Sequence, residues 1–166
     1  MSENSQLNLV LVEPEIPPNT GNIARLCAAT RTRLHLIEPL GFRLDDTTLK
    51  RAGMDYWRLV QWTCWPDWVA FQKSLPPEAQ LWFIESGGPL RYTDATFEFG
   101  DYLVFGRETK GLPMAFLENA RDHWLRIPML DPDARSLNLS NCASIVLYEA
   151  LRQTGFMGLS GPFAGS

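Results

Sequence analysis

The sequence has few of the residues that build disulfide frameworks and metal sites. Its 166 residues include three cysteines, Cys27, Cys64 and Cys142, and no two of them form a Cys-x-x-Cys pair. This spacing argues against a disulfide framework and a thiolate metal site, so we interpret the thiols as small apolar core residues. The two histidines, His35 and His123, have no His-Glu pairing at metal-ligand spacing, and we expect no metal ion.

Long apolar runs and the common nucleotide-binding signatures are also missing. No run approaches the roughly 20 apolar residues that span a bilayer, and the N-terminus lacks the layout of a secretory signal. We therefore expect a soluble, cytoplasmic protein with no membrane partner. The sequence lacks a Gly-x-Gly-x-x-Gly turn, a P-loop and a Gly-x-Ser-x-Gly elbow, which disfavours Rossmann dehydrogenases, P-loop ATPases and α/β-hydrolases.

The charge balance is acidic overall and basic in one segment. The net charge of -4 argues against a protein that holds nucleic acid by bulk electrostatics, because phosphate neutralisation supplies most sequence-independent affinity. Between residues 25 and 58, however, seven basic and four acidic residues give a local charge of +3. A basic face and a solvated surface of mixed charge are both compatible with this segment, and charge alone favours the second.

Tryptophan is concentrated in one stretch of the chain. Four of the six tryptophans stand within twelve positions, at Trp57, Trp62, Trp65 and Trp68. Packing between helices and sheet is the favoured interpretation of these rings. Stacking of a nucleic-acid base on one exposed ring is the alternative that the sequence leaves open.

Apolar segments of strand length alternate with segments of helical periodicity. Strands are predicted at residues 7–12, 34–37, 59–62, 81–84, 102–105 and 124–127. Helices are predicted at 47–52, 65–74 and 113–120, and a last helix runs from about residue 139 and stops at Gly155. The last helix has one continuous apolar stripe, at Leu139, Ala143, Val146, Leu147, Ala150 and Leu151. One more helix follows the prolines at 14, 17 and 18, with Asn19 or Thr20 as its cap and Arg25 off its apolar face.

This alternation of strands and helices predicts an α/β fold with a mainly parallel sheet and helices on both faces. We expect a single domain over residues 1–157 and a disordered tail over residues 158–166, which are rich in glycine, serine and proline.

Three polar loops follow predicted strands, at the carboxyl edge where open α/β sheets bind their ligands. They cover residues 19–25, 105–113 and 127–141. Taken singly, each loop also has a structural explanation as a helix cap or a strand-to-helix turn.

Together and in this order, the loops resemble the motifs of the SPOUT superfamily of knotted methyltransferases. The first loop has an asparagine followed six residues later by an arginine, and the second is similar to the superfamily's Phe-Gly-x-Glu-x-x-Gly-Leu motif. The third is similar to its Ile-Pro-Met…Ser-Leu-Asn-x-Ser-Asn motif, and the match spans about residues 7–153. Stretches at 13–22, 37–39, 51–56 and 148–150 resemble the branch that methylates the ribose of the anticodon wobble nucleotide.

The resemblance implies a fold, a cofactor and an assembly. The fold is a SPOUT-type α/β fold with a deep C-terminal trefoil knot, in a homodimer whose two subunits jointly build each site. S-adenosylmethionine is the methyl donor, and no metal takes part. The cofactor contacts are expected largely from backbone groups, at Ile84, Gly106, Ile127, Ser136 and the neighbouring Leu137.

The resemblance also implies the substrate. It points to 2'-O-methylation of the wobble nucleotide, a cytidine or modified uridine, in the tRNA anticodon stem-loop of leucine tRNAs. Another tRNA position or rRNA is the alternative within the same enzyme class. An RNA-binding module that has lost catalysis is the alternative outside it, and the intact set of polar motif residues argues against that module.

The catalytic group implied by the resemblance contains Arg25, with Asn19, Glu108, Ser136 and Asn138 in positioning roles. A guanidinium has a pKa above about 12, so we expect Arg25 to orient the ribose hydroxyl and stabilise developing alkoxide charge rather than remove its proton.

Three charged residues of the second loop leave alternatives open. Glu108 is equally suited to neutralising Arg25. Arg107 stands where relatives usually carry a small residue or proline, and with Lys110 it either contacts phosphate or is solvated.

Overall fold

The computed structural model describes residues 5–44 and 56–156. The helix predicted at 47–52, the tail predicted at 158–166 and most of the motif at 51–56 lie outside the described residues, as does the proposed domain end at residue 157. In the described residues, no helix is long and apolar enough to cross a membrane.

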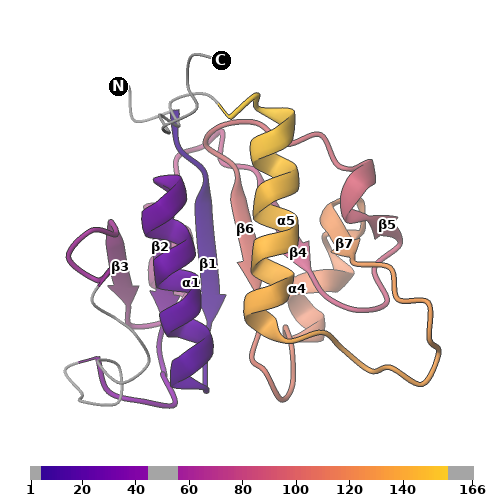
Figure 1. Ribbon diagram of the computed structural model, residues 1–166, viewed down its shortest axis with the longest axis horizontal. Coiled ribbons are helices and arrows are strands. Elements are labelled where there is room, and N and C mark those ends of the chain that lie inside the picture. Colours follow the sequence, from indigo (N-terminus) through magenta and orange to yellow (C-terminus); the bar gives the residue numbers. More distant parts are fainter. Residues whose placement is uncertain (1–4, 45–55, 157–166) are drawn as a thin grey trace.

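A parallel sheet of seven strands forms the centre of the molecule (Figure 1). Its order is β3-β2-β1-β6-β4-β7-β5, and every strand pair is parallel. The bounds are β1 Asn8–Val12, β2 Arg33–Ile37, β3 Trp62–Trp65, β4 Leu81–Ile84, β5 Leu90–Arg91, β6 Tyr102–Phe105 and β7 Trp124–Arg126. The predicted α/β class with a mainly parallel sheet is confirmed.

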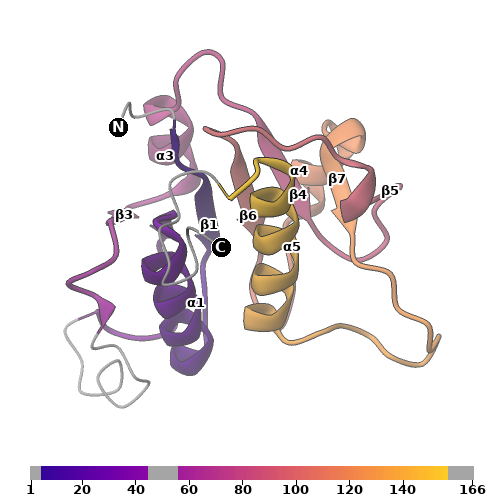
Figure 2. The same ribbon diagram turned by 45° about the horizontal axis from the view of Figure 1, so that its top comes forward.

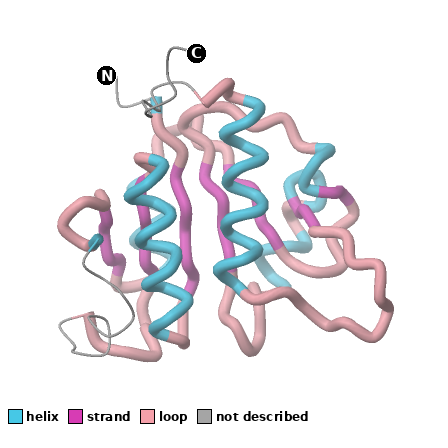
Figure 3. Tube along the Cα trace, in the orientation of Figure 1, coloured by secondary structure: helices cyan, strands magenta, loops and turns pink. Residues whose placement is uncertain are grey.

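Helices cover both faces of this sheet, as predicted. On one face α1 (Pro17–Thr30) and α5 (Leu139–Gln153) lie side by side in front of the sheet (Figures 1 and 2). The other face carries α3 (Trp68–Ser74) and α4 (Met114–Glu118), and two short 3-10 helices, η3 (Tyr92–Asp94) and η4 (Arg121–His123), complete the described elements. Figure 3 shows the long loops that join strands to helices. The trefoil knot is compatible with this arrangement and stays a prediction.

Alternate residues of each central strand enter two separate apolar clusters. Leu9 and Leu11 of β1 pack with α1 and α5, whereas Val10 and Val12 pack with residues of α3 and α4. Both faces of β1 are therefore buried, which explains its continuous apolar run. The stripe predicted for α5 is also confirmed, because its core positions are buried at Ala143, Val146, Leu147, Ala150 and Leu151.

The first helix begins earlier than predicted, and the assignment of Asn19 or Thr20 as its cap is wrong. Helix α1 starts at Pro17 with Ile16 in the capping position, and two prolines occupy its first turn. Proline suits this position because its φ is already helical and the first turn needs no donor N–H. The Asn19 side chain is consequently available for contacts outside its own helix.

The strand predicted at 59–62 is also wrong. Strand β3 begins at Trp62, where it pairs with Leu34, and continues to Trp65. The preceding residues turn instead, since the amides of Leu59 and Val60 both donate to the carbonyl of Tyr56. The next helix starts at Trp68 rather than at residue 65 because Asp67 caps it through the amide of Ala70.

His35 in β2 belongs to a hydrogen-bonded relay beneath α3. The indole N–H of Trp65 donates to His35 Nδ1 over 3.2 Å, so the ring proton stands on Nε2 and donates to Asn8 Oδ1 over 3.1 Å. Burial, with a smaller contribution from the charge of Arg33, lowers the pKa of His35 to about 4. The ring is therefore neutral in the native protein at pH 7.

This depressed pKa predicts an acid-sensitive component of stability. Between pH 6.5 and 4 the unfolded chain binds a proton that native His35 does not, so the free energy of unfolding falls by about 3 kcal/mol as the pH is lowered. Urea unfolding at pH 7, 5.5 and 4 measures it. His35→Gln is expected to lack this component, and an identical pH dependence in both proteins would contradict the assignment.

Candidate functional site

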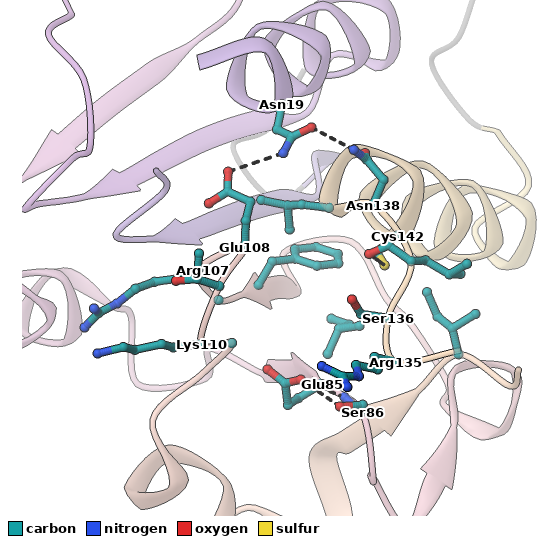
Figure 4. Close-up of a pocket in the computed structure, with 18 of the residues that line it drawn as sticks. Asn19, Glu85, Ser86, Arg107, Glu108, Lys110, Arg135, Ser136, Asn138 and Cys142 are labelled. Carbon is teal, nitrogen blue, oxygen red and sulfur yellow. Dashed lines mark hydrogen bonds between the residues drawn. The ribbon is translucent and has the colours of Figure 1, made fainter. Parts of the chain in front are cut away.

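A pocket of about 480 Å³ lies beyond the carboxyl ends of β4 and β6, and Ile127, immediately after β7, contributes to its lining. Figure 4 shows its polar side chains converging from different parts of the chain. Its apolar lining includes Ile84, Phe105, Ile127 and Leu139. The five positions expected to hold a cofactor, Ile84, Gly106, Ile127, Ser136 and Leu137, all line this pocket.

Two glycines allow the second loop to fold tightly against the pocket wall. The amide of Gly111 donates to the carbonyl of Arg107 over 2.9 Å, which closes the loop on itself. A Cβ on Gly106 would overlap the backbone of Gly111 and Leu112. Gly111 has a φ of +63°, and a Cβ there would overlap the carboxylate of Glu85. Only glycine satisfies both positions.

Glu108 fastens the second loop to the start of α1. Its carboxylate accepts hydrogen bonds from the amides of Glu15 and Ile16, at 2.8 and 3.1 Å, and from the side-chain amide of Asn19 at 3.4 Å. These donors, and not Arg25, surround the carboxylate within the described residues. The alternative in which Glu108 neutralises Arg25 is therefore wrong for a single chain.

A second amide continues this connection to the third loop. Asn138 donates from Nδ2 to Asn19 Oδ1 over 3.1 Å, and its own Oδ1 caps α5 through the amides of Ser140 and Asn141. The relay Glu108–Asn19–Asn138 thus joins all three predicted loops, as the dashed lines in Figure 4 show. The first of them, residues 19–25, is not a loop in the structure but part of helix α1, because the helix already begins at Pro17. Residues separated by more than 100 positions in sequence become one polar wall of the pocket.

Replacing Glu108 with glutamine is expected to loosen this wall. The amide keeps one acceptor oxygen and turns an NH₂ group toward backbone N–H donors, so the free energy of unfolding should fall by about 1–3 kcal/mol. Urea unfolding measures the loss, and hydrogen exchange should quicken at the amides of Glu15 and Ile16. Glu118→Gln, at an exposed position of α4, is the matched control. Equal behaviour of the two variants would show that the relay contributes nothing.

Two further contacts hold the same loops together. Arg107 pairs with Glu13 at 2.8 Å between Nη2 and Oε2, so its guanidinium bonds a carboxylate rather than being simply solvated or left for phosphate. Thr109 donates from its hydroxyl to Glu15 Oε1 over 2.7 Å, and this bond lowers the pKa of Glu15. Lys110 lines the pocket.

Arg25 is the one predicted catalytic residue that the fold of a single chain does not bring to the pocket. Asn19, Glu108, Ser136 and Asn138 all line it, whereas Arg25 is exposed on α1, with its Cζ 5.3 Å from the centre of the Tyr56 ring. Arg25 stands six positions after Asn19 in α1, which advances the helix by about 9 Å and turns the side chain to another direction.

Sequence reasoning missed Glu85, which follows β4 directly. Its carboxylate accepts from the amide of Leu112 over 2.8 Å and from the amide and hydroxyl of Ser86, at 2.9 and 3.1 Å. It therefore ties the loop after β4 to the second loop and lines the pocket. The sequence signal that could have identified Glu85 is its position as an acidic residue at the carboxyl end of a predicted strand.

Among the described residues that line the pocket, the one thiol is not a ready nucleophile. Cys142 lines it, but burial raises the pKa of this thiol to about 11, so it stays protonated at pH 7. In residues 5–44 and 56–156 no group of three or more His, Cys, Asp or Glu is placed to hold a metal ion. Polar positioning and backbone contacts are what this arrangement offers.

Known proteins similar to this chain match it over nearly its whole length. The SpoU rRNA Methylase family matches residues 6–148. The tRNA (cytidine(34)-2'-O)-methyltransferase of Saccharophagus degradans is 56% identical over 152 residues, which cover 91% of this chain and 97% of that protein.

Solved structures agree with these sequence matches. One from work on the 2-OH methylation of C/U34 on tRNA has a TM-score of 0.86 at 45% identity, covering 92% of this chain and 98% of that chain. The SpoU methyltransferase AviRb of Streptomyces viridochromogenes, solved with the cofactor AdoMet, has a TM-score of 0.77 at 26% identity, covering 91% of this chain and 61% of that chain.

Proposed function

The chain belongs to the SpoU rRNA methylase family, and we propose that it is an S-adenosylmethionine-dependent tRNA 2'-O-methyltransferase that acts on nucleotide 34. The observation that carries this proposal is the relay Glu108–Asn19–Asn138, which joins the three loops around one pocket. Similarity to proteins named for 2'-O-methylation of cytidine 34 supports ribose as the acceptor and nucleotide 34 as the position.

The pocket fits the proposed methyl donor. Its volume of about 480 Å³ lies in the range of small-molecule sites. Polar and charged residues make up half of its lining, which suits a charged methyl donor. We propose that backbone groups of Ile84, Gly106 and Ile127 hold S-adenosylmethionine, with Ser136 and Leu137 on the third loop, and the presence of all five residues in the pocket lining supports this. The bound donor supplies a methyl group activated by a positively charged sulfur.

The remaining task is to align and polarise the ribose hydroxyl. Asn19 and Asn138 are held rigidly by the relay, so they present fixed amide groups at the pocket wall. Arg25 orients the hydroxyl and stabilises the negative charge that develops on its oxygen while the hydroxyl proton passes to solvent water. The guanidinium keeps its own protons, since its pKa lies far above physiological pH.

The position of Arg25 supports a homodimer with shared sites. Within one chain Arg25 lies outside the pocket that the other motif residues line. We propose that each pocket is completed by Arg25 of the partner subunit, and that the dimer binds the anticodon stem-loop. RNA sequence is read mainly in loops and single strands, which suits a target nucleotide in the anticodon loop. Leucine tRNAs as substrates and the cytoplasm as location stay predictions.

Transfer of label from S-adenosylmethionine to total tRNA tests the proposed function. Digestion to nucleosides is expected to yield 2'-O-methylcytidine or a 2'-O-methylated uridine derivative that maps to nucleotide 34. Label on a base, or transfer to rRNA alone, would contradict the proposal and favour another enzyme of the family. Calorimetry without S-adenosylmethionine binding at millimolar concentrations would instead favour an RNA-binding module that has lost catalysis.

A further inference from the structure

An exposed aromatic side chain stands at the edge of the sheet beside α1. Trp62 opens β3, the edge strand of the sheet, and 42% of its surface is exposed. Leu59, in the turn just before this strand, is 64% exposed. Figure 1 shows β3 at the outer edge, next to the strand and helix that precede it. An exposed tryptophan calls for a reason, because its large ring is usually mostly buried.

The Trp62 ring is supported by other residues on the side that faces the protein. Trp62 pairs in register with Leu34, which belongs to the apolar cluster under α1. The ring packs on Trp57, with centroids 4.9 Å apart and planes tilted by 47°. Trp57 itself packs against the same cluster and is half-buried. Trp62 is thus a supported ring with one accessible side.

The same surface continues to Arg25. Trp57 follows Tyr56 directly, and the Arg25 guanidinium lies 5.3 Å from the centre of the Tyr56 ring. The turn after Tyr56 is fixed by two amides that donate to its carbonyl. We call Tyr56, Trp57 and Trp62, together with Arg25, the aromatic strip. It extends from the proposed catalytic arginine to the edge of the sheet.

The chain segments that contain Arg25, Tyr56 and Trp57 are rich in arginine, which suits a polyanion. Residues 25–44 and 56–58 contain five arginines and one acidic residue, although the whole chain has a net charge of -4. Four of these five side chains are exposed, at Arg25, Arg31, Arg43 and Arg58. Rings that offer a face for stacking, with arginines nearby to meet phosphates, are the combination that binds unpaired nucleotides.

From these observations we propose that the aromatic strip is a stacking platform for an unpaired nucleotide of the RNA substrate, with Trp62 as its outer ring. The proposal rests on the proposed function, because it assumes that the substrate is RNA. Stacking would hold the loop beside the target nucleotide without reading its sequence, since every base has a π-face. Trp62 is a substrate-binding residue in this scheme and has no part in the chemical step.

Substitutions at Trp62 test the platform. Trp62→Ala is expected to raise the tRNA KM, and the Kd for tRNA measured by fluorescence anisotropy, by about tenfold, with kcat and S-adenosylmethionine affinity unchanged. Trp62→Phe should restore most of the affinity because it keeps a ring, whereas Trp62→Leu should not. Val69→Ala is the matched control, because Val69 is 55% exposed on α3, which covers the opposite face of the sheet.

Two results would overturn the platform. Unchanged tRNA affinity in Trp62→Ala would show that the ring does not contact RNA. Conversion of the dimer to monomer in Trp62→Ala, measured by sedimentation, would show that the strip packs against a second copy of the chain. If the proposed function itself is wrong, the wild-type protein will transfer no methyl group to tRNA. The comparison of tRNA Kd between wild type and Trp62→Ala still tests the platform in that case.

Discussion

Replacing Arg25 with alanine is expected to lower kcat for methyl transfer at least about a hundredfold and to leave S-adenosylmethionine affinity unchanged. The two effects separate because Arg25 is proposed to act on the ribose hydroxyl, whereas the five residues proposed to hold the cofactor line the pocket without it. Loss of a group that stabilises developing charge typically costs two to three orders of magnitude in rate. Single-turnover kinetics and calorimetry measure the two quantities independently.

Arg121→Ala is the matched control, since Arg121 is an exposed arginine of η4 that does not line the pocket. Mixing subunits then tests where Arg25 acts. Randomly mixed dimers of Arg25→Ala and a pocket variant should regain roughly a quarter of wild-type activity, because half are mixed and each of these carries one intact site. Retained activity in Arg25→Ala would remove this residue from the reaction, and no recovery on mixing would contradict shared sites.

The pocket variant with the largest expected effect on the cofactor is Gly106→Ala. A methyl group at this position would overlap the backbone of Gly111 and Leu112. Backbone atoms cannot move aside as the end of a flexible side chain can. Overpacking of this kind costs about 1–3 kcal/mol, so S-adenosylmethionine affinity should fall between about tenfold and a hundredfold as the second loop is displaced. Calorimetry at one temperature compares the S-adenosylmethionine Kd of Gly106→Ala with that of the wild type.

Gly100→Ala controls for a general loss of stability. Gly100 has a φ of +93°, so alanine is strained there, but a Cβ would meet no atom within 4 Å and the residue does not line the pocket. This variant should be less stable than the wild type while binding the cofactor normally. If Gly106→Ala bound S-adenosylmethionine as tightly as Gly100→Ala does, the second loop would not form the cofactor wall.

The sequence was sufficient for the layers of this fold and for most of the predicted pocket residues, but it missed Glu85 and did not show that Arg25 lies outside the pocket of its own chain. Apolar runs such as that of β1 and the stripe of α5 are buried as their patterns predict. The three loops meet because parallel strands end at one edge of the sheet, a rule that needs no knowledge of side-chain contacts. Element boundaries were less predictable where a cap or a register decided them, as at Asp67 and Trp62.

The sequence did not predict the side-chain contacts within the pocket. Asn19 has the composition of a helix cap, and only the start of α1 at Pro17 frees its amide to bond Glu108 and Asn138. The partner of Arg107 is 94 positions away, so no local pattern points to Glu13. The direction of Arg25 depends on the turn of one helix, and the role that we propose for it depends on a second chain.

Removal of the 2'-oxygen from nucleotide 34 of the tRNA tests the proposed 2'-O-methylation most directly. The tRNA species identified by nucleoside mapping can be assembled by ligation with either a ribose or a 2'-deoxyribose at nucleotide 34 and no other difference. We predict that labelled S-adenosylmethionine methylates the ribose form and leaves the 2'-deoxy form without label. Equal labelling of both forms would place the methyl group elsewhere and contradict 2'-O-methylation of nucleotide 34.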